Sequence, residues 1–316
     1  MDRRNFIGKS LLGTMALSGL TKLGAKAANA DDSTTKPAKP LTVRDVQNHL
    51  RGMGAKWIPI DSKRTVDTIH AGDPDAQVTR IAVAWNGYLE TLKKVHEEGY
   101  DLIVVHEPPY YCLRNTKPTG FALEGANRKK KFLEESKLAL IRCHDVWDRV
   151  AEIGICDSWA KLLGLEKEIN RPANFDPTAA RPFHVAYEIE PVRAGDFAAT
   201  VAAKVAIHDH KNVMLVGPED KIVRSVAIGT GAITRFNQMV TELRPDLTLC
   251  SDDGFTFWRD GTLAIDMEYP VVIASHSSAE EFGMKQMADH LAKTFPQVLV
   301  RHIPEKAMYQ QIGPKS

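Results

Sequence analysis

The stretch DLIVVHEPPYY, residues 101–111, places an imidazole and a carboxylate directly after four consecutive apolar residues. A short apolar run bounded by an acid and by prolines is typical of a buried strand in an α/β sheet. Neighbouring side chains of a strand point to opposite faces, so His106 and Glu107 can reach one ligand only if the strand has already ended. Pro108 and Pro109 end it, because neither can donate to a sheet ladder and Pro108 favours an extended Glu107. The stretch therefore predicts a functional strand end.

Short β-branched runs alternate with amphipathic helical runs on both sides of this stretch, which is the pattern of α/β units around a sheet. The order recurs, because Ile81 lies 145 residues before Val226 and Asp101 lies 145 residues before Asp246. We therefore predict an α/β fold with two similar lobes, although strand-helix-strand units of similar length also arise without duplication. The predicted divisions are a first lobe at residues 41–166, a middle region at 167–217 and a second lobe at 218–316.

The N-terminal residues 1–30 have the features of an export signal. They carry Arg3 and Arg4 ahead of a short apolar run and end in Ala-Asn-Ala at 28–30. The run is too short to span a bilayer, so we expect a removable signal and no membrane attachment after its removal. Paired arginines point to twin-arginine export of an already folded protein, and thus to a periplasmic or exported location. An uncleaved amphipathic N-terminus is the alternative, and residues 31–40 are expected to form a linker.

The charge balance argues against nucleic acid as a partner. The formal net charge of the 316-residue chain is +1, and residues 31–316 carry 36 Lys and Arg against 39 Asp and Glu, or −3. A phosphate-backbone footprint needs Lys and Arg clustered on one face. We interpret RKKK at 128–131 as a solvated helix face and IHDHK at 207–211 as a solvated loop. Cys143 and Cys250 lie in apolar strand-like runs, where buried thiols are the first interpretation and disulfides the alternative.

Imidazoles and carboxylates recur at the predicted strand ends, where side chains from several strands of an α/β sheet converge on ligands. A His followed four residues later by an acid occurs as His144 with Asp148 and as His276 with Glu280. Such a set without thiolates suits zinc, iron or manganese, and two metals that share a carboxylate need a set of this size. For any single histidine, a hydrogen-bonded role at a strand end is the alternative. The remaining candidates at these ends are His106, Glu107, Asp145, Asp252 and Asp253.

These motifs resemble the Nif3-like dinuclear metal family, also described as GTP cyclohydrolase I type 2-like proteins. The resemblance covers residues 41–303 and is carried by VDTIHAGDP (66–74), HEPPYY (106–111), HDVWDRVAEIGICDSWAKLLGL (144–165) and SHSSAEEFG (275–283). It implies two interlinked α/β lobes with a metal site between them at the carboxyl ends of the strands. Carried over position by position, it implies that Glu280 is a bridging carboxylate and that the metal ligands are His106, Glu107, Asp148, His276 and Glu280.

Glu107 stands where the family has a second histidine, which places the chain in a His-Glu-Pro subgroup of the resemblance. A carboxylate at this position makes the site harder and more anionic, which favours manganese, iron or magnesium and can weaken one of two sites. Asp145 stands where the family has threonine. It is either an additional ligand or a partner that orients His144.

The leading functional hypothesis is a metal-dependent hydrolase with one or two divalent ions (Zn, Fe or Mn) per subunit, in which His144 and Asp145 move protons. Its substrate would be a small molecule, with phosphorylated and nucleotide-like compounds as candidates. The resemblance also implies a toroidal homohexamer. The alternatives are a non-catalytic metal-binding or interaction protein on a ring scaffold, and a nucleotide-binding domain that uses the glycines of IGTGAITRF at 228–236.

Overall fold

The computed structural model describes residues 39–54, 65–112, 116–172 and 183–309, together with Ile312 and Pro314. The predicted signal at 1–30 and residues 31–38 of the predicted linker lie outside the described residues. Within the described part of the chain, no helix is both long enough and apolar enough to cross a bilayer.

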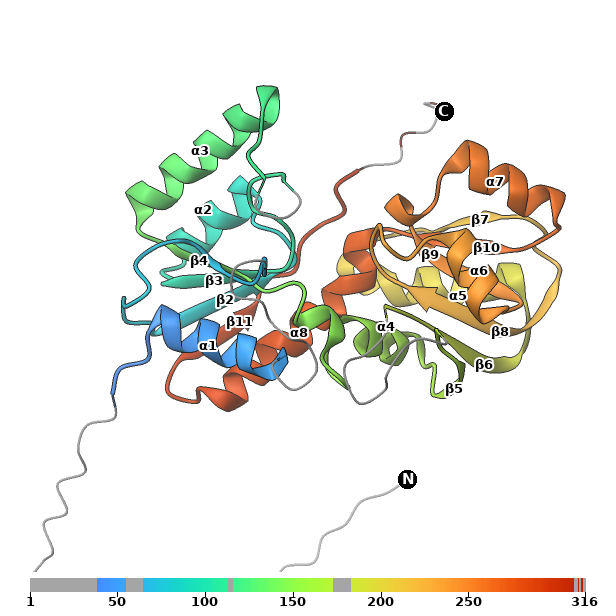
Figure 1. The fold of residues 1–316 in the computed structure, drawn as a ribbon, viewed down its shortest axis with the longest axis horizontal. Helices are drawn as coiled ribbons and strands as arrows, with labels where there is room; N and C mark the ends of the chain where they lie inside the picture. Colours follow the sequence, from blue (N-terminus) through green and yellow to red (C-terminus); the bar gives the residue numbers. More distant parts are fainter. Residues whose placement is uncertain are drawn as a thin grey trace, which may run out of the picture. The chain divides into compact units, whose positions relative to one another are not determined.

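One sheet is built around the strand predicted at the start of the 101–111 stretch. Its five strands are β1 (Ile69–Ala71), β2 (Arg80–Ala84), β3 (Leu102–Val105), β4 (Ala139–Arg142) and β11 (Leu299–His302). They lie in the order β1-β4-β3-β2-β11, with β1 antiparallel to β4 and the other pairs parallel. Figure 1 shows β4, β3, β2 and β11 in this order. All residues of β3 are buried, as expected for a central parallel strand that is covered on both faces.

A second sheet holds the remaining strands. Its six members are β5 (Lys167–Asn170), β6 (His184–Arg193), β7 (Met214–Val216), β8 (Ile222–Gly229), β9 (Leu247–Ser251) and β10 (Val271–Ala274). They lie in the order β5-β6-β8-β9-β10-β7. The strands β8, β9 and β10 are parallel to one another, whereas β7 and β6 pair antiparallel with β10 and β8.

The two sheets share a core order. An antiparallel edge strand, β1 or β7, is followed by three parallel strands that run in reverse chain order. Ile81 pairs with Leu102 in the first sheet, and Val226 pairs with Leu247 in the second. Each residue of the second pair lies 145 positions after its counterpart, so the strand register matches the spacing of the repeat. The predicted α/β fold with two similar lobes is confirmed.

The sheets divide the chain differently from the predicted boundaries. Residues 167–217 are not a separate region, because they contribute β5, β6 and β7 to the second sheet. Within the predicted second lobe at 218–316, helix α8 (His276–Thr294) leads away from β10, and β11 then pairs with β2 of the first sheet. The lobes are thus interlinked. Apolar periodicity indicates where strands lie in the sequence but not which strands pair. The sequence therefore did not predict that β11 pairs with β2.

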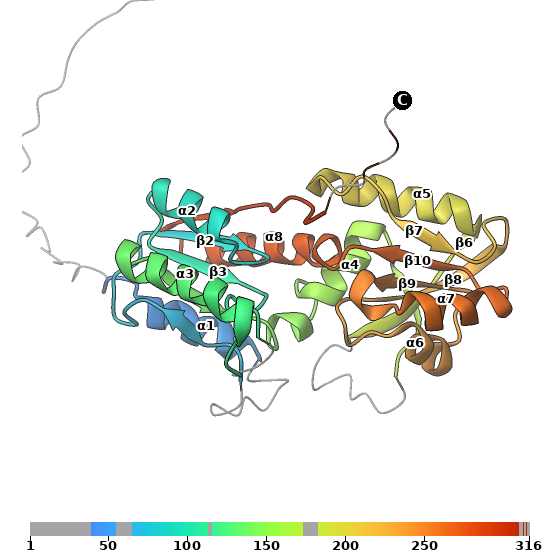
Figure 2. The same ribbon diagram turned by 90° about the horizontal axis from the view of Figure 1, so that it is seen from above.

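Helices cover both faces of each sheet. They are α1 (Val43–Gly54), α2 (Leu89–Glu97), α3 (Gly120–Ser136), α4 (Ile155–Leu163), α5 (Ala194–Val205), α6 (Phe236–Leu243) and α7 (Phe257–Asp266), besides α8. Ile81 shares a core with Leu50 of α1 and Met287 of α8, whereas its neighbour Ala82 shares the opposite core with Leu92 of α2. On the second sheet, α5 covers one face, and α6 and α7 cover the other (Figure 2).

Two interpretations of polar runs hold except at one residue each, because the other described side chains of 128–131 and 207–211 are exposed. Lys129, inside the run at 128–131, is only 2% exposed, and its Nζ donates a hydrogen bond to the carbonyl oxygen of Pro109 at 2.9 Å. His210, inside the run at 207–211, is also buried and lies 3.3 Å from the hydroxyl of Ser277. In both cases one polar atom of a run turns inward to reach a partner that is distant in sequence. Cys143 and Cys250 are buried free thiols, as predicted.

Gly217, which follows β7, has a φ of +84° and lies against the backbone of Tyr269. A Cβ at this position would be 2.4 Å from the Tyr269 carbonyl oxygen, so Gly217→Ala combines backbone strain with a clash. We expect it to lower the free energy of unfolding by about 2 kcal/mol or more. In Gly52→Ala, the matched control within α1, the new Cβ meets nothing within 4 Å, and we expect a gain of up to about 1 kcal/mol. Urea unfolding measures both, and changes of the same sign would contradict this account.

His49 of α1 and His290 of α8 stack with their ring centroids 5.1 Å apart and their Nε2 atoms 2.8 Å apart. Burial lowers the pKa of both imidazoles below the ordinary 6.5. The unfolded chain therefore binds more protons than the folded chain below about pH 6.5, so the stability is full above this pH and falls as the pH drops. We expect His290→Gln to reduce the acid-side loss of stability, whereas His96→Gln at an exposed position does not. Identical pH dependence of urea unfolding in the two variants would refute the assignment.

Candidate metal centre

The predicted metal ligands come from the ends of three structural elements and lie together. His106 and Glu107 follow β3 directly, and Asp148 lies in a short 3-10 helix (Trp147–Arg149) beyond the end of β4. His276 and Glu280 occupy the first two turns of α8, where a spacing of four places them on one face. The expectation that ligand-binding side chains gather at the carboxyl ends of strands thus identified side chains that converge in space.

Glu280 lies at the middle of the cluster. Its Oε2 is 3.4 Å from Nε2 of His106, and its Oε1 is 3.0 Å from Nε2 of His276. Asp148 approaches the same His106 Nε2 at 3.1 Å, and Glu107 approaches the His276 Nε2 at 3.6 Å. One carboxylate therefore faces two imidazoles with different oxygens, which is the arrangement that a bridging ligand requires.

Three features of the cluster fit a divalent cation. His106 Nε2 and Glu107 Oε1 are buried, yet neither has a hydrogen-bond partner among the described residues. Ligand atoms of His106, His144 and Asp148, and likewise of His106, Glu107 and Glu280, all lie within 4.8 Å of one another. Imidazole nitrogens and carboxylate oxygens without thiolates suit zinc, iron and manganese.

A glycine preserves space at the same place. Gly231 has a φ of +72°, and a Cβ there would lie 3.1 Å from Nε2 of His276 and 3.7 Å from Oε1 of Glu280. Its backbone N–H donates to the hydroxyl of Ser251 at 2.9 Å, which fixes the glycine against the end of β9. The glycine-containing stretch at 228–236 is therefore part of the wall of the metal centre.

Hydrogen bonds orient each imidazole through its Nδ1 and leave its Nε2 toward the cluster. Nδ1 of His106 lies 3.1 Å from the carbonyl oxygen of Cys143, to which it donates. Nδ1 of His144 lies 3.1 Å from Oδ1 of Asp145, and Nδ1 of His276 lies 2.9 Å from Oδ2 of Asp253. Such contacts fix the ring tautomer and raise the basicity of the other nitrogen.

Two supporting residues were absent from the sequence-based set. The Trp85 indole donates from Nε1 to Oε2 of Glu280 at 2.8 Å, and its ring lies edge-on to that of His276. The Asp67 carboxylate accepts from the backbone N–H groups of His144 and, at 3.2 Å, of Val146. Trp85 directly follows β2. A search of the strand ends that included the indole N–H of tryptophan would therefore have identified it. Asp67 lies in the VDTIHAGDP stretch, but no local pattern marked its role.

The electrostatics of the cluster favour positive charge at its centre. Burial alone would lower the pKa of His106, but Glu280 and Asp148 raise it to about 9. The pKa of His276 is likewise raised well above its ordinary value by Glu280 and Asp253, against the effect of burial. Burial would raise the pKa of Glu280, and the two imidazoles lower it to about 2. The Glu280 carboxylate thus stays ionised and attracts cations, whether protons or a metal.

The sequence profile of the family described as Duf34/NIF3 (NGG1p interacting factor 3) matches residues 42–307. The chain belongs to this family. It is 24% identical over 237 residues to the GTP cyclohydrolase 1 type 2 homolog of Clostridium perfringens, covering 71% of this chain and 87% of that protein. It is 26% identical over 225 residues to the homolog of the same name from Methanocaldococcus jannaschii, covering 69% and 82%.

Solved structures with low sequence identity share the fold of this Duf34/NIF3 member. Hypothetical protein SA1388 of Staphylococcus aureus has a TM-score of 0.69 at 18% identity, covering 87% of this chain and 100% of that one. Reduced HcgD from Methanocaldococcus jannaschii has a TM-score of 0.62 at 21% identity, covering 84% and 98%. These likenesses support the fold and leave the chemistry to be argued from the residues of this chain.

The Trp85 indole positions Glu280 without being a potential ligand itself. Trp85→Phe keeps the aromatic ring and removes the donor, so we expect the affinity for zinc or manganese to fall about tenfold while the fold remains. Trp258→Phe is the matched control, because Trp258 on α7 is 77% exposed. Competition with a chromogenic chelator measures both affinities. Equal metal affinity in the two variants would show that the indole does not orient Glu280.

Proposed function

We propose that this Duf34/NIF3 protein is a metal-dependent hydrolase that acts on a small molecule. The observation that carries the proposal is the Glu280 carboxylate, whose two oxygens face Nε2 of His106 at 3.4 Å and Nε2 of His276 at 3.0 Å. The name GTP cyclohydrolase 1 type 2 homolog, which the relatives carry, favours phosphorylated or nucleotide-like substrates. An exported protein meets GTP rarely, so other small hydrolysable compounds belong to the same proposal.

One or two divalent ions, Zn, Fe or Mn, would be held by two overlapping ligand sets. His106 and Asp148 would bind on one side, Glu107 and His276 on the other, and Glu280 would be shared. A divalent cation supplies Lewis-acid chemistry, because it polarises a substrate oxygen and makes water a stronger nucleophile at neutral pH. The carboxylate of Glu107 makes its half of the site harder than an imidazole would, which favours manganese or iron there.

His144 and Asp145 are proposed to move protons. The His144 side chain is 25% exposed, in contrast to the buried His106, so it has contact with both solvent and the cluster. Its Nε2 lies 3.9 Å from Oε1 of Glu107, and its Nδ1 lies 3.1 Å from Oδ1 of Asp145. The Asp145 contact keeps a proton on Nδ1, which leaves Nε2 of His144 as the atom that accepts or returns a proton.

We also propose twin-arginine export to the periplasm and assembly into a homohexamer. Export is supported by Arg3 and Arg4 ahead of the short apolar run, and the ring by the family resemblance. A folded, metal-loaded chain is the cargo that this export route accepts. The partners proposed are thus a small-molecule substrate and further copies of this chain.

The second candidate function is metal binding without catalysis. Burial of the ligand set favours it, since His106, Glu280 and Asp148 are 0%, 2% and 7% exposed. A site closed to this degree holds an ion well but offers a substrate little surface.

The Glu280→Ala variant tests the proposal with Asp289→Ala as control, because Asp289 lies on the same helix and pairs with Lys285 at the surface. We expect Glu280→Ala to lose bound metal and to reduce hydrolysis of a phosphoester panel to below about one hundredth, with the control unchanged. Metal content and turnover are measured on the same samples. Metal-free protein with full activity would sink the hydrolase proposal, and metal-loaded protein inactive on every substrate class would favour the second candidate.

A further inference from the structure

A small cavity lies beside the segment that carries the metal ligands. Its volume is ≈220 Å³, and Pro108, Pro109 and Tyr110, which directly follow Glu107, form part of its wall. Among the described residues, the charged ones that line it are all cationic, because Lys117, Lys130 and Arg142 contribute and no aspartate or glutamate does. A cavity lined by cations alone attracts anions.

Arg142 is the buried part of this lining. Its residue is 3% exposed, and its Nε donates to the carbonyl oxygen of His106 at 3.0 Å. The acids that attract its guanidinium most strongly are Glu107 and Asp145, and neither of them lines the cavity. Arg142 thus stands between the anionic metal centre and a cavity without acids of its own. A planar guanidinium suits an oxyanion such as a carboxylate or a phosphate.

The wall formed by Pro109 and Tyr110 is also held firmly. Lys129 of α3 is buried and donates to the carbonyl oxygen of Pro109 at 2.9 Å, and its Nζ lies 4.4 Å from the ring centroid of Tyr111. The next residue, Lys130, lies with its Nζ 5.1 Å from the ring centroid of Tyr110 and lines the cavity. Helix α3 therefore fixes the turn after the metal ligands and carries a cation to the cavity.

His70 adds a neutral polar group to the wall. Burial and the nearby Arg142 lower its pKa to about 4, so its imidazole is uncharged at neutral pH. At neutral pH, the charge of the described lining of the smaller cavity is then that of Lys117, Lys130 and Arg142.

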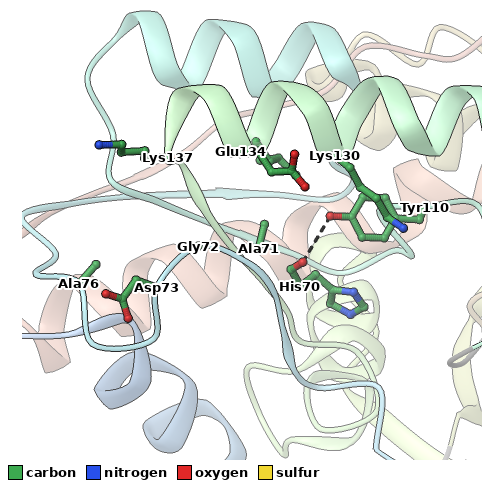
Figure 3. A pocket seen from close by; sticks show the side chains of 10 residues that line it. His70, Ala71, Gly72, Asp73, Ala76, Tyr110, Lys130, Glu134 and Lys137 are labelled. Atoms are coloured by element: carbon green, nitrogen blue, oxygen red, sulfur yellow. Dashed lines mark hydrogen bonds between the residues drawn. The ribbon is translucent and has the colours of Figure 1, made fainter.

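A larger cavity of ≈670 Å³ adjoins the first, because His70, Tyr110 and Lys130 line both. Figure 3 shows Tyr110 and Lys130 close together beside His70, with Glu134, Asp73 and Lys137 also on the wall. The larger cavity thus carries charges of both signs, and the cation-only lining belongs to the smaller one. The rings of His70 and Tyr110 meet edge-on with centroids 5.9 Å apart. Apolar groups such as Leu133 also line this space, so it can accept the less polar body of a ligand.

We propose that the two cavities form one binding site for a small organic anion. The oxyanion, a phosphate or a carboxylate, lies against Arg142, Lys117 and Lys130, and the body of the ligand extends past Tyr110 into the larger cavity. None of the proposed metal ligands lines either cavity. The site is therefore distinct from the metal centre and does not depend on the proposed hydrolysis.

Calorimetric titration of the metal-loaded full-length protein tests the site. The probes are phenyl phosphate and benzoate, which separate the two oxyanions, and benzamide, which lacks the charge. We expect at least one anion to bind with a millimolar or lower Kd, and the Lys117→Gln/Lys130→Gln double variant to bind it about tenfold more weakly. Lys131→Gln is the control, because Lys131 adjoins Lys130 on α3 and is likewise exposed, but lines neither cavity.

A second variant separates this site from the metal centre. Glu280→Gln alters the metal cluster and leaves the cavity walls intact, so we expect unchanged anion binding. The proposal is overturned if the double lysine variant binds as tightly as the unmodified protein, or if Glu280→Gln abolishes binding and so places the anion on the metal. Equally tight binding of benzamide, or no binding of either anion at millimolar concentration, would also overturn it.

Discussion

The Glu280 carboxylate is the group on which the arrangement of the metal centre depends. A buried ionised carboxylate is costly unless its oxygens are paired, and here every neighbour of those oxygens comes from a different part of the fold. The Trp85 indole follows β2, the His106 imidazole follows β3, and His276 lies one turn earlier on α8. Since α8 starts after the second sheet and leads to β11 of the first, one side chain joins the polar ends of both sheets.

The duplicated layout assigns different tasks to equivalent positions. At an offset of 145 residues, His106 corresponds to Ser251 and Glu107 corresponds to Asp252. The Ser251 hydroxyl accepts the N–H of Gly231, and Oδ1 of Asp252 accepts the backbone N–H of His276 at 3.1 Å. In the first repeat, the side chains of His106 and Glu107 offer ligand atoms. In the second, Ser251 and Asp252 instead accept hydrogen bonds from the backbone beside the metal centre. The similarity of the halves thus lies in backbone geometry and their difference in the chemistry of the strand ends.

The sequence predicted the strands and the set of candidate ligands because both depend on local signals. Apolar runs fix β3, and the residue after such a run lies at a sheet edge whatever the rest of the chain does. It did not predict Lys129 as a buried donor or β11 as a strand of the first sheet. The partners of these residues, the Pro109 carbonyl and β2, are set by tertiary packing. Trp85 was missed for a related reason, because an indole is read as core until the acceptor beside it is known.

The return of β11 to the first sheet determines when the fold can be completed. Until β11 arrives, β2 is an open edge, and α8, which carries His276 and Glu280, has no strand after it to anchor its far end. The contacts that close the sheet join residues 80–83 to residues 299–302, a separation of most of the chain, and contacts of this range form slowly. Synthesis must therefore pass residue 302 before the first sheet can close around the ligands. The ability to hold an ion is then a late event of folding, and a loaded ion would report that β11 has closed the first sheet.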